Sequence, residues 1–361
     1  MNTSAAVTVV KRNPFMRLRF TRPMQIDLLL ENQTFEVLDH DVICAVVHAE
    51  QPICTDRLAY ALDRKEGSPK AQALVQELLR ARVLVAQDYR NPLQDAAEHW
   101  QQRGWLDALV LHLRSRNVAY HDFGAQAFIG PQRSALIETP ACAPCIDSVC
   151  ASRGDITLPP GAGQSFQGTL YEAMSQRRTG RPWTGRPMDG NGLADILRYG
   201  NLESLGNREE TANDKSSDAQ AVFDRSSFAA LETYVVVNRV EGVPQGVYRY
   251  SVTRQALLLI SHGDFNERLV DMCIGQAKVR NCAAALVIGT HWAQYYGRYR
   301  HPRAYRNLLI NCAELAHYYI LCATAAGLSN FITPAFNDEV AEAIIGKPCT
   351  DVGPLYMVAI G

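Results

Sequence analysis

The sequence predicts an α+β protein of two domains, and three observations support this prediction. The chain has 361 residues, which is long for one domain and makes two the better expectation. Apolar residues make up 47% of it and charged residues 20%, as is typical of a soluble globular protein with a sizeable core. Segments with the two-residue period of strands and the 3.6-residue period of helices occur in both halves.

Residues 1–90 are expected to form a small winged-helix domain. Residues 24–48 alternate in polarity or run apolar, which predicts two short strands and the turn between them. Pro69 is expected to open a helix, because the apolar residues that follow share one face: Leu74, Val75, Leu78 and Leu79. Residues 83–85 then predict the wing strand.

Residues 91–163 are predicted to connect the two domains. A helix is expected between Pro92 and Leu113, with Trp100 and Trp105 among its apolar positions. The string LPPGAG at 158–163 is the clearest linker signal in the chain. We therefore place the main boundary there and begin the second domain at residue 164.

Three cysteines cluster in this connector: Cys142, Cys145 and Cys150. Thiolates at this spacing can share a zinc ion, but a closed structural site needs four ligands and only three are local. His112 or His121 could supply the fourth ligand, and redox-active thiols or an ordinary cysteine-containing turn are the alternatives. We therefore expect no metal site in the chain.

The second domain, residues 164–361, is predicted to mix helices and strands. Helices are expected at 168–177, 189–199, 265–281, 303–326 and 337–345. Strands are expected at 234–238, 246–250, 256–260, 286–290 and 356–360. The segment 203–220 has almost nothing to bury, so it is expected to be an exposed loop.

Charge and sequence patterns argue against several classes of function. The net charge is −1, with 36 basic and 37 acidic residues, which gives no reason to expect a nucleic acid or an anionic membrane as partner. No apolar run is expected to span a bilayer, and the N-terminal residues lack the order of a signal peptide. The cytoplasm is the expected location, where most of the ten cysteines would be reduced and buried.

The strongest local signal for chemistry is the string SQRRTGRPW at 175–183. Two adjacent arginines and a threonine offer several charge-assisted donors in a small space, and guanidinium groups match phosphate oxygens well. An arbitrary arginine pair is more often a solvated helix end. This one lies just after the linker, and a phosphate site is what the family resemblance described next implies for it.

The pattern Ser-x-Arg-Arg-Ser/Thr-x-Arg-x-aromatic opens the nitroreductase flavoprotein fold, which this half of the chain resembles. Three further segments resemble a subgroup of that family, the streptolysin- and microcin-type azoline dehydrogenases that act on ribosomally made peptides. They are LETYVVVNRVEGVPQGVYRYSVTRQALLLISHGD, RAYRNLLINCAELAHYYILCATAAGLSN and PLYMVAIG. The resemblance covers about 168–361 and implies an antiparallel or mixed sheet flanked by helices.

The resemblance also implies an FMN bound at a homodimer interface. The residues that match the family's phosphate and ribityl contacts are Arg177, Arg178 and Thr179. Arg303 and Arg306 match a second basic pair near the cofactor, and a salt-bridged helix N-terminus is the alternative for them. The stretch SNFITPAF at 329–336 matches the loop that packs against the isoalloxazine, which makes Phe331 and Thr333 further candidates.

Two segments depart from the pattern of the subgroup. Where the subgroup has a Pro-Ser-Ala/Gly-Gly turn, Ser226 and Ser227 occupy the small positions, but Arg225 and Phe228 are bulkier. Flavin binding with altered geometry is therefore expected. The second departure concerns the lysine of a Lys-Tyr pair that precedes the subgroup's Arg-x-Tyr-Arg motif, because the stretch HWAQYYGRYRHPRAYR contains no lysine.

That pair lies where a base removes a proton from the ring while a hydride leaves for the flavin. With one inserted residue, Arg298 and Tyr299 align with it; without the insertion Tyr299 and Arg300 do. Tyr299 can relay a proton, whereas an arginine stays protonated and can only stabilise a phenolate. We expect Tyr299 and Arg298 to be catalytic, and the alternatives are Tyr295, Tyr296 and His301.

The resemblance implies FMN-dependent oxidation of thiazoline or oxazoline rings to thiazoles or oxazoles in a precursor peptide, as in bacteriocin biosynthesis. The sequence has no P-loop, so a separate cyclodehydratase subunit is the expected partner that forms the rings. The winged-helix domain is expected to hold the leader of the peptide by strand addition, with docking or dimerisation as the alternative. A flavin oxidoreductase for a small molecule and a non-catalytic scaffold subunit remain open as other functions.

Overall fold

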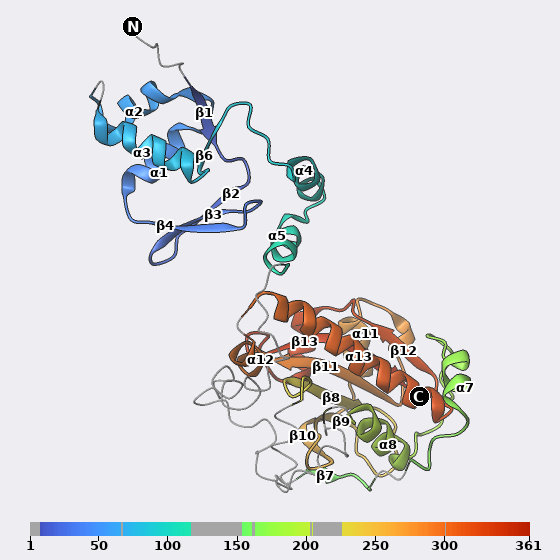
Figure 1. The fold of residues 1–361 in the computed structure, drawn as a ribbon. Coiled ribbons are helices and arrows are strands. Elements are labelled where there is room, and N and C mark those ends of the chain that lie inside the picture. The colour runs from blue at the N-terminus through green and yellow to red at the C-terminus, as the bar shows by residue number, and fades with distance from the viewer. Residues whose placement is uncertain are drawn as a thin grey trace, which may run out of the picture. The chain divides into compact units, whose positions relative to one another are not determined.

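The structure, a computed structural model, describes residues 8–65, 68–116, 154–160, 163–202, 204, 226–299 and 301–361. The expectations for Cys142, Cys145 and Cys150, and nearly all of those for 203–220, lie outside the described residues. The chain divides into two compact units, Met1–Tyr120 and His121–Gly361. Figure 1 labels most elements of the two units, which are described one at a time below.

The first unit contains two three-stranded antiparallel sheets. In one, the order is β5 (Ile53–Cys54), β1 (Val9–Arg12) and β6 (Leu84–Ala86). In the other it is β2 (Met16–Arg19), β3 (Met24–Leu28) and β4 (Gln33–Val37). The helices α1 (His40–His48), α2 (Thr55–Asp63) and α3 (Pro69–Arg80) share a core with both sheets, in which Val10, Ile26, Leu58 and Leu84 are buried.

The expected helix after Pro69 is present, and the expected strands are present up to Val37. The prediction for 24–48 is wrong for its last part, since His40–His48 is a helix. Asp39 caps its N-terminus by accepting a hydrogen bond from the backbone N–H of Asp41 at 3.0 Å. The apolar run VICAVV resembles a buried strand by composition, so its composition alone could not distinguish a strand from a helix.

The helix expected between Pro92 and Leu113 is two helices, α4 (Gln94–Gln102) and α5 (Leu106–Arg114). Gly104 separates them with a φ of +72°, a left-handed conformation that glycine adopts without strain. Both helices pack on the rest of the first unit through a second apolar cluster: Phe15, Leu29, Leu30, Ala97, Leu109 and Leu113.

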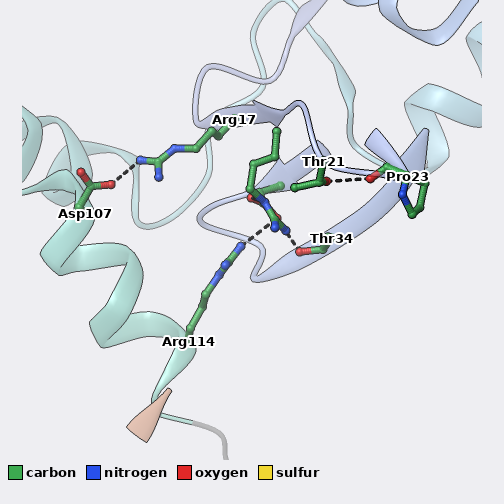
Figure 2. Close-up of polar contacts among 8 residues, drawn as sticks. Arg17, Thr21, Pro23, Thr34, Asp107 and Arg114 are labelled. Carbon is green, nitrogen blue, oxygen red and sulfur yellow. Dashed lines mark hydrogen bonds and ion pairs between the residues drawn. The ribbon is translucent and has the colours of Figure 1, made fainter. Parts of the chain in front are cut away.

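A buried carboxylate fastens α5 to the polar face of the β2–β3–β4 sheet (Figure 2). The side chain of Asp27 is 3% exposed and accepts hydrogen bonds from Arg19 at 2.6 and 2.9 Å and from Thr34 at 2.6 Å. Arg114 of α5 forms an ion pair with it at 3.0 Å. Burial alone would raise the pKa of Asp27, but these donors outweigh burial and lower it to about 2. Arg17 and Asp107 form a second ion pair between sheet and helix.

The second unit is built on a seven-stranded sheet with antiparallel pairing along its whole width. Its strand order is β12 (Asn330–Thr333), β13 (Val352–Ile360), β11 (Ala284–His291), β8 (Leu231–Val237), β9 (Gly246–Ser251), β10 (Ala256–His262) and β7 (Ile156–Thr157). All five expected strands are present. The edge strands β7 and β12 were not predicted from the sequence.

Helices cover both faces of this sheet (Figure 1). On one face lie α8 (Gly190–Gly200) and α13 (Arg303–Ala325), which share a core with Val235, Leu286 and Val358. On the other lie α11 (Asn266–Met272) and α14 (Asp338–Ile345), which share a core with Val236, Val287 and Met357. Alternate residues of each strand therefore point to opposite cores.

One helical prediction needs correction, and one helix was not predicted. The helix expected at 265–281 ends after α11, because Ile274 and Gly275 have φ values of +56° and +73°; a short 3₁₀ helix, η2 (Ala277–Val279), follows. The helix α12 (Trp292–Arg298) was not predicted.

Within the described residues, α13 alone is long and apolar enough to cross a bilayer, with a mean hydropathy of 1.3 in its most apolar window. This differs from the expectation that no segment would pass such a test. The same test is passed by core helices, and α13 buries Leu308, Cys312, Leu315 and Tyr319 against the sheet.

Candidate cofactor and substrate site

The arginine-rich segment predicted from the sequence lies beside the edge strand β12. It follows α7 (Leu170–Gln176), whose start is fixed by a reciprocal capping box between Thr169 and Glu172. Thr179 pairs with Asn330 in a parallel bridge, and its hydroxyl accepts a hydrogen bond from the backbone N–H of Ile332 at 3.4 Å. The strings SQRRTGRPW and SNFITPAF, which are far apart in the sequence, are thus brought together.

The two arginines of this segment differ in what they contact. Arg178 donates from Nη1 to the backbone oxygens of Ser175 and Arg177 at 3.0 and 2.7 Å, so its guanidinium folds over the end of α7. Arg177 is half-buried, and its guanidinium has no hydrogen-bond or ion-pair partner among the described residues. Arg177 is therefore free to bind an external anion.

A third cation, Lys278 of η2, lies next to this segment. Gly180 has a φ of +75°, and a Cβ placed there would lie 2.9 Å from Nζ of Lys278. The indole N–H of Trp183 donates to the backbone oxygen of Lys278 at 2.9 Å and holds η2 in place. No ion pair to Lys278 is found in the described part of the chain. No sequence pattern indicated this lysine, because its place beside Gly180 depends on a left-handed turn and on the docking of η2.

We call Arg177, Arg178 and Lys278, which come from two neighbouring segments, the cationic cluster. Arg178 has further N–H donors beyond the nitrogen that binds the helix end, and Thr179 adds a hydroxyl. No carboxylate is paired with any of the three cations within the described residues. This donor set is suited to a phosphate group, so the residues present fit the phosphate end of a flavin nucleotide.

Phe331 and Thr333, the other candidates on β12, have structural contacts. The Phe331 ring is buried in the core on the α11 and α14 face. Thr333 is buried too, and its hydroxyl accepts from the N–H of Ala335 at 3.0 Å and lies 3.2 Å from the oxygen of the same residue. Their contact with a flavin remains a prediction.

The catalytic candidates lie around α12 and the start of α13. Tyr299 ends α12, and its ring lies 4.9 Å from that of Tyr295, which donates from its hydroxyl to the oxygen of Ala304 at 2.9 Å. Arg298 is in the last turn of α12, and its side chain is outside the described atoms. Arg303 and Arg306 lie half-buried in the first turn of α13, and both make contacts within the chain.

An open cavity of about 180 Å³ brings several of these residues together. Its lining residues are Ser227, Tyr295, Tyr299, Asn307, Ile310 and Asn311. Asn311 joins α13 to the turn before β8 by donating to the oxygen of Ser227 at 3.2 Å. The prediction had placed Ser227 and Tyr299 at one site but had not singled out the asparagines.

Neither Ser226 nor Phe228 lines this cavity. The Ser226 hydroxyl accepts from the N–H of Phe228 at 3.1 Å, which closes the turn. The Phe228 ring is 1% exposed and packs in the core, 6.5 Å from the ring of Tyr318. The bulk of Phe228 therefore does not obstruct the cavity, whereas Arg225 is outside the described residues.

The cationic cluster and the cavity lie at opposite ends of α13, as Figure 1 shows for the neighbouring helices α7 and α12. A second hollow, between α7 and the far end of α13, is lined by Gln176 and Thr324, while the cavity contacts Asn307 and Asn311. The helix rises about 20 Å between Asn311 and Thr324 at 1.5 Å per residue. Within one chain, the two groups of candidates therefore do not form a single site.

The described residues contain no cluster of three or more histidine, cysteine or acidic side chains that could hold a metal ion. Burial raises the pKa of the thiols of Cys273, Cys282 and Cys312 to about 12. These thiols therefore stay protonated near neutrality and behave as small apolar side chains.

Comparison with known proteins agrees with the resemblance inferred from the sequence. The model of the nitroreductase family matches residues 175–361. The trifolitoxin operon protein TfxC of Rhizobium leguminosarum bv. trifolii is 32% identical over 311 residues, which are 84% of this chain and 84% of that protein. A second relative, MJ1384 of Methanocaldococcus jannaschii, is 25% identical over 53% of this chain and 90% of its own length.

Among solved structures, the chain is similar to part of the E. coli microcin synthetase McbBCD complex with truncated pro-MccB17 bound. The identity is 16% and the TM-score 0.40, over 76% of this chain and 98% of the other.

Proposed function

Because the chain belongs to the nitroreductase family, we propose that it is an FMN-dependent enzyme that oxidises thiazoline or oxazoline rings of a ribosomally made peptide to azoles. The observation that carries the proposal is the cationic cluster, in which the half-buried Arg177 has no partner among the described residues. The peptide substrate is supported by the similarity to TfxC, a protein of the trifolitoxin operon, across most of both chains.

FMN would be held at its phosphate by Arg177, Arg178 and Lys278, with Thr179 close to the ribityl chain. Charge-assisted hydrogen bonds from guanidinium groups to phosphate are among the strongest that a protein surface offers. Ser227 would approach the flavin from the cavity side. Arg303 and Arg306, in the first turn of α13, stay candidates for contacts with the cofactor on the cavity side.

A homodimer would unite the two halves of this site. The cluster of one copy would face the cavity of its partner, because the two lie about 20 Å apart along α13 in one chain. Both helices next to these groups expose large apolar side chains: Leu170, Tyr171 and Met174 on α7, and Tyr305, Leu309 and Ile310 on α13. Exposed apolar faces of this kind are typical of protein–protein interfaces.

The oxidation removes one proton and one hydride from the two saturated carbons of the ring. A bound flavin supplies the hydride acceptor, and dioxygen is the class of oxidant that regenerates it. Tyr299, on the wall of the cavity, would pass the ring proton to solvent through its hydroxyl. Arg298, the neighbouring residue in the sequence, remains the proposed partner that stabilises a phenolate.

The first unit would bind the leader of the precursor peptide, and a cyclodehydratase would supply the rings. The strand β4 lies at the edge of its sheet and pairs only with β3 among the described strands. Such an edge can accept an extended peptide as an additional strand. The winged-helix assignment of this unit is part of the same proposal.

The proposal is tested by mixing purified, FMN-loaded protein with a peptide that contains one thiazoline and following its mass. Loss of two hydrogens per ring is the expected result. An unchanged peptide in the presence of a yellow protein would favour the small-molecule oxidoreductase. A protein that stays colourless after addition of FMN would favour the scaffold subunit.

A further inference from the structure

Two asparagines of the cavity wall, Asn307 and Asn311, have no role in the function proposed so far. They are four residues apart on α13, so both side chains lie on the same side of the helix. Ile310, which is 62% exposed, lies beside them and gives this wall an apolar part. Tyr299 lines the same cavity from the end of α12.

Both carboxamides have unused hydrogen-bonding capacity. Asn311 uses one N–H on the oxygen of Ser227, which fixes the orientation of its amide; its side-chain oxygen has no partner within the described residues. The Asn307 carboxamide makes no hydrogen bond within the described residues. Asparagine is also a poor helix former, so neither residue is placed here for the stability of α13.

A carboxamide matches a peptide unit, since it can donate to a peptide oxygen and accept from a peptide N–H at the same time. The cavity, at about 180 Å³, is smaller than the pockets that enclose drug-sized molecules. It can take one five-membered ring with the peptide units beside it. Ile310 provides an apolar surface for the ring, and the asparagines provide the polar contacts.

We infer that Asn307 and Asn311 bind the peptide backbone that flanks the ring and so position the ring beside Tyr299. This inference rests on the proposed function, because it names how the same cavity holds its substrate. The two asparagines are positioning residues and take no part in proton or hydride transfer.

The test uses full-length, FMN-loaded protein and a precursor peptide that keeps its leader and carries a single thiazoline between two glycines. Asn307→Ala and Asn311→Ala are each expected to raise KM about tenfold, the effect of one or two hydrogen bonds, with kcat within about twofold of the wild type. FMN binding should not change. His317→Ala is the matched control, because this exposed residue of α13 lies outside the cavity lining.

A second probe identifies the hydrogen bond itself. In an ester analogue of the peptide, an oxygen replaces the N–H next to the ring. With the wild type, the ester should have a higher KM than the amide peptide. With Asn307→Ala or Asn311→Ala this increase in KM should be smaller, because the partner of the N–H is already missing. An equal increase in KM from amide to ester in all three proteins would overturn the inference.

The outcomes separate a failure of the proposed function from a failure of this inference alone. If the wild type leaves the ring intact, the proposed function falls and this inference with it. If the wild type oxidises the ring and both variants keep their KM, the inference alone falls. Variants that lose FMN and their oligomeric state together would show that the asparagines join subunits, which also overturns it.

Discussion

Replacing Arg177 by alanine should weaken FMN binding without weakening the fold. The Arg177 guanidinium has no partner among the described residues, so the substitution removes no contact of the free protein. A hydrogen bond to a charged group contributes about 1.5–3 kcal/mol, and one such interaction corresponds to a roughly 10- to 150-fold higher Kd for FMN. We therefore expect a Kd increase in that range and an unchanged Tm of the apoprotein.

Arg178→Ala is the informative comparison. Its Nη1 also binds the oxygens of Ser175 and Arg177 at the end of α7, so this variant should lose stability as well as affinity. The Kd is measured by the quenching of FMN fluorescence, and stability by the thermal melting of the apoprotein. An Arg177→Ala protein that binds FMN like the wild type, or that melts early without FMN, would refute the assignment of Arg177 to the phosphate.

Three further predictions concern the proton relay, the ion pairs of the first unit and the subunit interface. Tyr299→Phe should abolish ring oxidation in the mass assay while the flavin spectrum of the purified protein persists; retained turnover would exclude the hydroxyl from the mechanism. The pKa of Asp27 is lowered from 3.8 to about 2, so its contribution of about 2 kcal/mol is complete above pH 4 and is lost as the pH falls toward 2. Denaturant unfolding should therefore show a shallower loss of stability in acid for Asp27→Asn than for the wild type, and parallel curves would contradict this. Leu309→Glu, at an exposed apolar residue of α13 outside the cavity lining, should give a monomer with little bound flavin in size-exclusion chromatography; a flavin-loaded monomer would contradict a shared site.

The sequence identified residues of the candidate site better than it identified their neighbours. The arginine pair and Thr179 stood out because they belong to a pattern that resembles a known family and follow a linker. Lys278 could not be found, because its place beside Gly180 depends on a left-handed turn and on the docking of η2. Asn307 and Asn311 gave no signal either, since polar residues on a long amphipathic helix usually face solvent.

The fold of the second unit was largely predictable, and the shorter elements were not. Strands such as β8 and β11 contain apolar runs in the centre of a sheet, at residues 234–237 and 284–288, which sequence patterns indicate well. The edge strand β12 has only four residues, and its pairing with β13 is a long-range contact that no local period reveals. The mistaken strand at His40–His48 has a different cause, because six apolar residues in a row fit the period of a strand as well as that of a helix.

The length of α13 has a consequence for how the protein should be handled. If each flavin is bound at one end by one subunit and at the other end by the second subunit, flavin binding requires the dimer. The fraction of protein with bound flavin then depends on protein concentration by mass action. Dilution would then release coenzyme and turn a yellow solution pale, and concentrating the sample would restore its colour.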